Sequence, residues 1–255
     1  MDKKYELTDE VNEDGLRRIV ALRDIPRHNV KKGDLGGFVE SEKNLSQEGD
    51  AWVGENAWVY DNAHVYDNAC VQGNAWIYDN ARVSGSAYVY DNARVYDDAQ
   101  VFGCAYICED AKVFGNAQIS EYACVQGNAW VFDNASVYEN AQVYDNARVF
   151  DDAYVSGAYV SGNAEVFGNA CVFGDAHIFG DARVSSGKDY IVFKNWWSSE
   201  RYFTWTRSNN MWKVGCFYGT GEELIAKAEK DSELSGREYK RIVDYVESIL
   251  KDEED

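Results

Sequence analysis

Few side chains in this 255-residue chain could act as a general base or as transition-metal ligands. The sequence has three histidines, His28, His64 and His177, and six cysteines without a CxxC pair. Acyl transfer needs a positioned base such as histidine, and a structural zinc site needs several Cys or His at short spacing. No phosphate-binding loop, GxSxG or HExxH motif occurs. We therefore predict no catalytic residue, no metal ligand and no cofactor, which favours a function other than catalysis.

The charge of the chain also limits its partners. There are 44 acidic and 25 basic side chains, for a formal net charge of −19. Direct binding to nucleic acids needs clustered Lys and Arg, and docking on an anionic membrane needs the same. No apolar run reaches the ~18 residues of a membrane-spanning helix, and the charged N-terminus lacks a signal peptide's apolar stretch. We expect a cytoplasmic protein that binds neither nucleic acid nor membrane directly.

The dominant feature of the sequence is a repeat of six residues. Alanine recurs every six residues from Ala51 to Ala153, and again from Ala158 to Ala182 after one unit of five residues that ends at Gly157. The third position is always Val or Ile, and the fifth and sixth are nearly all Asp, Asn, Gly or Glu. The 23 units resemble the hexapeptide repeat. This resemblance implies a left-handed parallel β-helix of triangular cross-section with three units per coil, and hence seven to eight coils.

The chemistry of the repeat agrees with that fold. A branched residue at position 3 suits an inward-facing strand position, with positions 2 and 4 facing outward. Alanine at position 1 is small enough to turn inward at a corner. Asp, Asn and Gly at positions 5 and 6 tolerate the left-handed backbone of a tight corner, and stacked Asn side chains can bond from coil to coil. The predicted architecture is therefore mainly β.

Every third unit stacks, so the outward residues can be sorted by face. One face collects large aromatic side chains, and we predict it as a binding surface made of Trp58, Tyr60, Trp76, Tyr78, Arg94, Tyr96, Phe114, Trp130, Phe132 and Phe150. Aromatic rings in neighbouring coils can simply stack and stabilise the sheet. They can also form an interface, because a contiguous exposed apolar patch is unusual on a monomer. We expect a second copy of the chain or the C-terminal segment to cover this face.

A column of aspartates follows the same face at the next corner. It consists of Asp61, Asp79, Asp97, Asp133 and Asp151. Aspartate at a turn is first a conformational choice, although a column of carboxylates at coil spacing costs repulsion. We predict that this acidic ridge binds cations or faces a basic partner.

The flanks complete three predicted domains: an N-terminal cap over 1–36, the β-helix over 37–186, and a small α+β domain over 187–255. The segment 36–53 resembles the opening of uncharacterised bacterial and prophage hexapeptide-repeat proteins, which are labelled as transferases. For the C-terminal domain we expect strands over 190–197, 201–207 and 211–218 and then two helices. Thr220 and Ser235 are the expected N-caps, with a capping box at Ser235, and Trp196, Trp197, Trp205 and Trp212 are the expected core.

These features favour a non-enzymatic acidic binding protein. The resemblance of residues 36–53 to prophage proteins and the negative charge of the predicted β-helix suggest an inhibitor, or DNA mimic. Its target would be a basic nucleic-acid-binding host protein. The first alternative is a self-associating scaffold with the aromatic face as its seam, and we expect a homo-oligomer. The second alternative is an acyltransferase of the hexapeptide type, as the resemblance implies.

Overall fold

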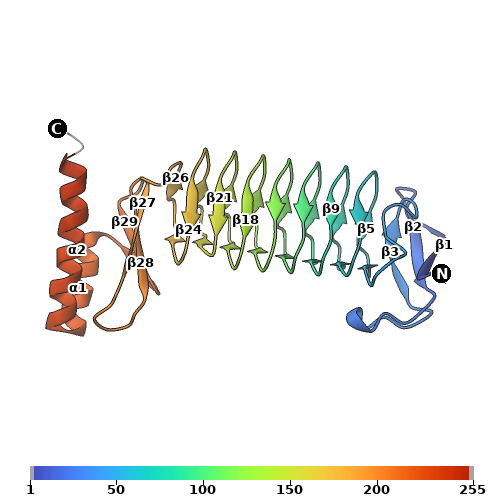
Figure 1. Ribbon diagram of the computed structural model, residues 1–255, viewed down its shortest axis with the longest axis horizontal. Coiled ribbons are helices and arrows are strands. Elements are labelled where there is room, and N and C mark those ends of the chain that lie inside the picture. The colour runs from blue at the N-terminus through green and yellow to red at the C-terminus, as the bar shows by residue number, and fades with distance from the viewer. Residues whose placement is uncertain (1–2, 253–255) are drawn as a thin grey trace.

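The computed structural model describes residues 3–252 and shows a prism built from three parallel β-sheets, with further structure at both ends (Figure 1). Residues 1–2 and 253–255, which fall in the predicted cap and C-terminal domain, lie outside the described residues. The hydrogen-bonded strands in each sheet come from every third unit of the repeat, as in the pairing of Arg94 with Lys112. The predicted mainly β solenoid of seven to eight coils is confirmed.

Each face of the prism is one column of short strands. The aromatic face contains β5 (Trp58–Val59), β8 (Trp76–Ile77), β11 (Arg94–Val95), β14 (Lys112–Val113), β17 (Trp130–Val131), β20 (Arg148–Val149), β23 (Glu165–Val166) and β26 (Arg183–Val184). The second face contains β4 (Trp52–Val53), β7 (Cys70–Val71), β10 (Tyr88–Val89), β13 (Tyr106–Ile107), β16 (Cys124–Val125), β19 (Gln142–Val143), β22 (Tyr159–Val160) and β25 (His177–Ile178). The third face contains β6 (His64–Val65), β9 (Arg82–Val83), β12 (Gln100–Val101), β15 (Gln118–Ile119), β18 (Ser136–Tyr138), β21 (Tyr154–Ser156) and β24 (Cys171–Phe173).

The repeat fills the interior of the prism with two kinds of side chain. The alanines at position 1 and the Val or Ile side chains at position 3 are almost completely buried in one continuous core. Because each coil presents the same small set of inward groups, the strands stay in register along the axis. Burial of branched apolar side chains at every coil supplies the main stabilisation of the rod.

The corners turn at position 5 alone. The acidic residues there have φ between 53° and 60°, as at Asp61 and Asp145, and glycine takes the same conformation in other coils. No position-6 residue of the described repeat units has a positive φ, so one residue per corner adopts the left-handed backbone. Asn and Asp at position 6 instead form ladders, as where Asn62 Nδ2 donates to Asn80 Oδ1 at 3.2 Å. The five-residue unit keeps the register, because Gly157 (φ 63°) leads directly into Ala158.

The N-terminal segment closes one end of the prism. Strands β1 (Tyr5–Val11), β2 (Arg17–Ala21) and β3 (Leu35–Val39) are joined in antiparallel order, and β3 then pairs in parallel with β5. Strand β3 therefore continues the column of the aromatic face, with Phe38 paired to Trp58. A short 3₁₀ helix, η1 (Pro26–His28), lies along the rod, where Arg27 Nη2 donates to Ser86 Oγ at 2.7 Å.

The C-terminal unit has one strand more than we predicted. Its antiparallel sheet is formed by β27 (Tyr190–Lys194), β28 (Tyr202–Thr206), β29 (Met211–Val214) and β30 (Phe217–Gly219). The expected strand over 211–218 is wrong, because Gly215 has a φ of 54° and reverses the chain into a hairpin. Helices α1 (Gly221–Asp231) and α2 (Glu233–Asp252) pack on this sheet around Trp205 and Trp212.

Two smaller expectations about this unit are also wrong. The capping box belongs to α1, where Thr220 Oγ1 accepts from Glu223 N and the Glu223 carboxylate accepts from Thr220 N. Ser235 lies inside α2, and Ser232 Oγ accepts its N–H at 3.0 Å. Trp196 is not in the core, because 73% of its surface is exposed, whereas Trp205 and Trp212 are buried as expected.

Candidate binding surfaces of the solenoid

The outer aromatic column of the aromatic face is a continuous stack of rings. It occupies position 4 and consists of Tyr60, Tyr78, Tyr96, Phe114, Phe132, Phe150 and Phe167. Neighbouring ring centroids are 4.9 to 5.3 Å apart and nearly parallel, so each half-buried ring covers the next. Burial raises the pKa of Tyr78 to about 12. Since the ring faces contact one another, the column presents ring edges to solvent.

A second column on this face, at position 2, combines tryptophans with charged side chains, in the order Trp58, Trp76, Arg94, Lys112, Trp130, Arg148, Glu165 and Arg183. Trp58 stacks on Trp76 with centroids 5.0 Å apart, and the Arg94 guanidinium lies 4.6 Å from the Trp76 ring centroid. Lys112 Nζ lies 4.6 Å and the Arg148 guanidinium 5.0 Å from the Trp130 ring centroid, one on each side. Such cation–π contacts stabilise the column. Together the two columns place all ten predicted residues of the aromatic face side by side along one sheet.

The C-terminal segment does not cover this face, which corrects half of our expectation. Its sheet lies beyond the last coil, at the end of the prism (Figure 1). Thr204 Oγ1 accepts from His177 N at 2.8 Å and Ser208 Oγ accepts from Arg183 N at 2.7 Å. These bonds satisfy backbone donors at the edge of the terminal coil, so the unit acts as a cap.

The acidic ridge is held by hydrogen bonds between coils. Asp97 Oδ2 accepts the N–H of Gly115 at 3.0 Å, and Asp151 Oδ2 accepts that of Gly168 at 2.9 Å. The same bond links Asp61 to Asp79, Asp79 to Asp97 and Asp133 to Asp151, at 3.3 to 3.4 Å. Each carboxylate therefore satisfies a backbone donor in the next coil, and its charge stays at the surface.

The other two corners use acidic residues in the same way. Glu109 Oε2 accepts from Gly127 N at 2.7 Å at one corner, and Asp67 Oδ2 accepts from Gly85 N at 3.2 Å at another. Sequence reasoning did not predict these bonds. The available signal was an acidic residue followed, 18 positions later, by glycine or another acidic residue. Ten of these carboxylate–amide bonds occur along the rod within the described residues.

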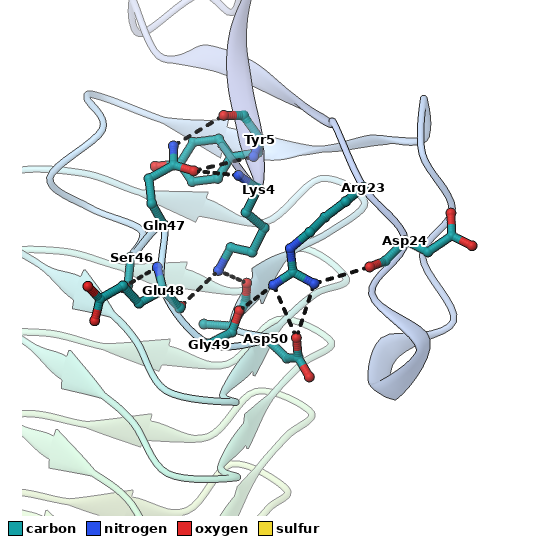
Figure 2. Close-up of polar contacts among 10 residues, drawn as sticks. Lys4, Tyr5, Arg23, Asp24, Ser46, Gln47, Glu48, Gly49 and Asp50 are labelled. Atoms are coloured by element: carbon teal, nitrogen blue, oxygen red, sulfur yellow. Dashed lines mark hydrogen bonds and ion pairs between the residues drawn. The ribbon is translucent and has the colours of Figure 1, made fainter. Parts of the chain in front are cut away.

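A polar clamp fixes the N-terminal strand to the first coil (Figure 2). The buried Lys4 Nζ donates to the Ala51 carbonyl at 2.7 Å, and Arg23 Nη2 donates to the Gly49 carbonyl at 2.8 Å and lies 3.3 Å from Asp50 Oδ1. Gln47 bonds the backbone of Lys4 and Tyr5 in both directions. Burial, with a further contribution from the Arg23 charge, lowers the pKa of Lys4 to about 8.

The side chains with catalytic potential are dispersed. His64 lies on the third face, His177 on the second and His28 in η1, and burial lowers the pKa of each. Hydrogen bonding to the Cys124 thiol lowers the pKa of Cys108 to about 7, but the Cys108 side chain is only 4% exposed. Among residues 3–252 no group of three or more His, Cys, Asp or Glu has the arrangement to hold a metal ion.

Helices long and apolar enough to cross a membrane do not occur in the described part of the chain. Three segments of the solenoid, residues 75–89, 87–103 and 141–157, match the family described as the YdcK beta solenoid repeat. Each segment is about one coil long and lies within the stacked strands. The match supports a β-solenoid repeat protein, while the resemblance to hexapeptide transferases remains a prediction. No curated protein sequence matches the chain.

Proposed function

We propose that the chain is a non-enzymatic binding protein whose acidic corners contact a basic surface of a protein partner. The arrangement of its carboxylates is the observation that carries this proposal. They stand in columns at the corners of the prism, nearly all exposed, and the coil-to-coil bonds hold their backbone positions fixed. A preorganised row of like charges attracts an oppositely charged surface without the cost of ordering the charges on binding.

The spacing of these charges supports a partner that normally binds nucleic acid. Residues 51–186 carry 18 carboxylates and five basic side chains. At ~4.8 Å per coil the rod is roughly 35 Å long, so there is about one carboxylate per 2 Å of axis. B-form DNA carries one phosphate charge per ~1.7 Å of axis. The rod therefore offers a DNA-like density of negative charge, which favours an inhibitor or DNA mimic over a passive acidic surface.

Capture from a cell extract tests this function. The full chain serves as bait, and duplex DNA is added as competitor during a second capture. We expect nucleic-acid-binding proteins to be enriched on the bait and to be released by DNA. Enrichment of proteins that DNA does not release would contradict the proposal.

The aromatic face favours self-association as a second candidate function. Four of the five basic residues of the repeat, Arg94, Lys112, Arg148 and Arg183, stand in its position-2 column, where Arg183 forms an ion pair with Glu165 at 3.1 Å and the other three are available to a partner copy. The acidic ridge runs along the opposite margin of the same face, with Asp97 in the same unit as Arg94. A two-fold axis parallel to the rod would place the basic column of each copy over the ridge of the other. Such an interface is self-complementary, as two-fold symmetry requires.

A charge swap tests this second candidate. The double variants R94E/R148E and D97K/D151K should each be monomeric, because each places like charges opposite each other. An equimolar mixture should form a heterodimer, since both sets of pairs become opposite in sign. Light scattering gives the masses, and circular dichroism checks folding. A monomeric wild-type protein, or a mixture that stays monomeric, would exclude this interface.

A further inference from the structure

The C-terminal unit contains a cavity that none of the functions above uses. It has a volume of about 380 Å³ and lies between the 195–201 loop, the β29–β30 turn, α1 and the start of α2. Its apolar floor includes Val214, Phe217, Leu224 and Ala228. A concave site with an apolar floor and a few convergent polar groups is typical of small-molecule binding.

The polar groups of this cavity are mainly donors. Arg201 and Lys227 stand at its margin, and neither forms an ion pair within 4.0 Å among the described residues. Lys227 Nζ instead lies 5.3 Å from the Phe217 ring centroid, and Arg201 Nη1 approaches Gly215. The carboxylate in the lining is that of Asp231, which is exposed. In a chain of net charge −19, two cations without carboxylate partners at one cavity are a local excess of positive charge.

A buried hydroxyl group adds a directed donor. Tyr239 lines the cavity and is only 8% exposed. Its oxygen accepts from Asn195 Nδ2 at 3.2 Å, while Asn195 Oδ1 accepts from Ser198 N and Ser198 Oγ, both at 3.0 Å. No described residue accepts the hydroxyl proton of Tyr239. Because Tyr239 lines the cavity, an oxygen of a bound ligand can accept a hydrogen bond from its hydroxyl group.

The N-terminus of α2 lies at the same cavity. Ser232 and Ser235 line it, and Ser232 Oγ caps the first turn of this 20-residue helix. The partial positive charge of a helix N-terminus favours an anion, although Glu233 in the first turn and Asp231 beside it oppose a large negative charge. This balance favours a singly charged group over a phosphate dianion.

We propose that this cavity binds a small monocarboxylate with an apolar body. The carboxylate lies between Arg201 and Lys227 and accepts the Tyr239 hydroxyl proton. The apolar body covers Phe217, Leu224 and Ala228. This site does not depend on the acidic corners, so it is a second binding function of the chain.

Titration of the full chain with sodium hexanoate, followed by ¹⁵N NMR, tests the proposal. We expect saturable shifts confined to the cavity, including Ser198, Cys216 and Lys227. Hexanamide, which has the same apolar body without the charge, should bind at least tenfold more weakly. Inorganic phosphate, which has charge without an apolar body, should not compete. Absence of saturable binding, or equal binding of hexanoate and hexanamide, would overturn the proposal.

Single substitutions test whether the carboxylate of hexanoate contacts Arg201 and Tyr239. Arg201→Gln should weaken hexanoate binding at least tenfold, and Tyr239→Phe about three- to tenfold, because it removes only the hydroxyl group. Arg241→Gln is the matched control, since Arg241 pairs with Glu238 on α2 and does not line the cavity. Equal weakening by Arg241→Gln would overturn the assignment. The variant D79N/D97N/D133N should bind hexanoate normally, which separates this result from failure of the proposed function.

Discussion

Acidic residues at position 5 of the repeat have two structural roles and one electrostatic role. Their backbone adopts the left-handed conformation that ends each face, and their carboxylates accept an amide proton from the next coil. Both roles leave the charge exposed. A column of carboxylates can therefore persist on a stable rod, because each repulsive contact is offset by a hydrogen bond and a satisfied turn.

Substitution of Asp97 separates these roles. Asp97→Ala should lower the free energy of unfolding by about 2 kcal/mol, because Ala tolerates the positive φ of this position less well than Asp, by up to ~1 kcal/mol, and the lost hydrogen bond costs a similar amount. Asp97→Asn should cost less than about 0.5 kcal/mol, since Asn tolerates this conformation and keeps an acceptor oxygen. Urea denaturation compares the two. Equal losses for Ala and Asn would contradict this explanation, because Asn keeps both the tolerance of the turn and the acceptor oxygen.

The buried Lys4 predicts a rise in stability at alkaline pH. Its pKa is about 8 in the folded chain against an ordinary value of 10.5. Between these values the unfolded chain binds more protons, so stability rises with pH. Burial raises the pKa of Tyr5, so that residue lowers stability only above its ordinary value of 10.0. The window is therefore pH 8 to 10.

Thermal melting across that window measures the effect. The wild-type Tm should increase relative to that of Lys4→Met, which cannot titrate and cancels the contribution of all other groups. A constant Tm difference between the two proteins would show that the folded-state pKa of Lys4 is not lowered.

Burial at individual positions was predictable from the sequence, whereas the hydrogen-bond partners were not. The six-residue period predicts that Val95 and Ala93 face the interior, regardless of the conformation of the corner. Any other placement would expose one column of apolar side chains. The bond from Gly115 N to Asp97 depends on the side-chain rotamer across two coils. A one-dimensional pattern does not specify that rotamer.

At the scale of elements, the repeat was easier to predict than its flanks. Because 23 units share one pattern, a single irregular unit does not change the prediction. The short unit that ends at Gly157 keeps the strands in register. The C-terminal unit has a single copy of each element. There one residue, Gly215, divided a predicted strand into β29 and β30. The capping signals at Thr220 and Ser235 could not be ranked by spacing alone, because both are followed three residues later by Glu.

The capping box of α1 gives a prediction at this scale. Thr220→Ala should lower the stability of the C-terminal unit by about 1 kcal/mol, because the Glu223 N–H loses its side-chain acceptor, whereas the backbone N–H of residue 220 keeps the Glu223 carboxylate. Ser248→Ala is the control, since the Ser248 hydroxyl donates to a carbonyl within its own helix and should cost less than ~0.5 kcal/mol. Hydrogen exchange of the α1 amides reports the local effect. Faster exchange in the control alone would contradict the assigned cap.

At the scale of the whole molecule, the caps decide which surfaces remain for recognition. The N-terminal sheet and the C-terminal sheet close the two ends of the prism, so its sides are the surfaces left for partners (Figure 1). Those sides carry alternating stripes of acidic corners and aromatic or mixed faces. The sequence predicted both stripes, because outward residues sort by unit number. It did not predict that the C-terminal unit caps the rod instead of covering the aromatic face.

Competition with DNA for a basic DNA-binding protein measures whether the acidic corners act as a DNA-like surface. A labelled duplex is bound to the DNA-binding protein found by capture, and the full chain is titrated against it. We expect the wild type to displace the duplex, and D79N/D97N/D133N to do so at least tenfold less well. The control E6Q/E222Q/E247Q, with the same loss of charge away from the ridge, should match the wild type. Equal displacement by the two triple variants would show that the acidic ridge does not contact the DNA-binding protein.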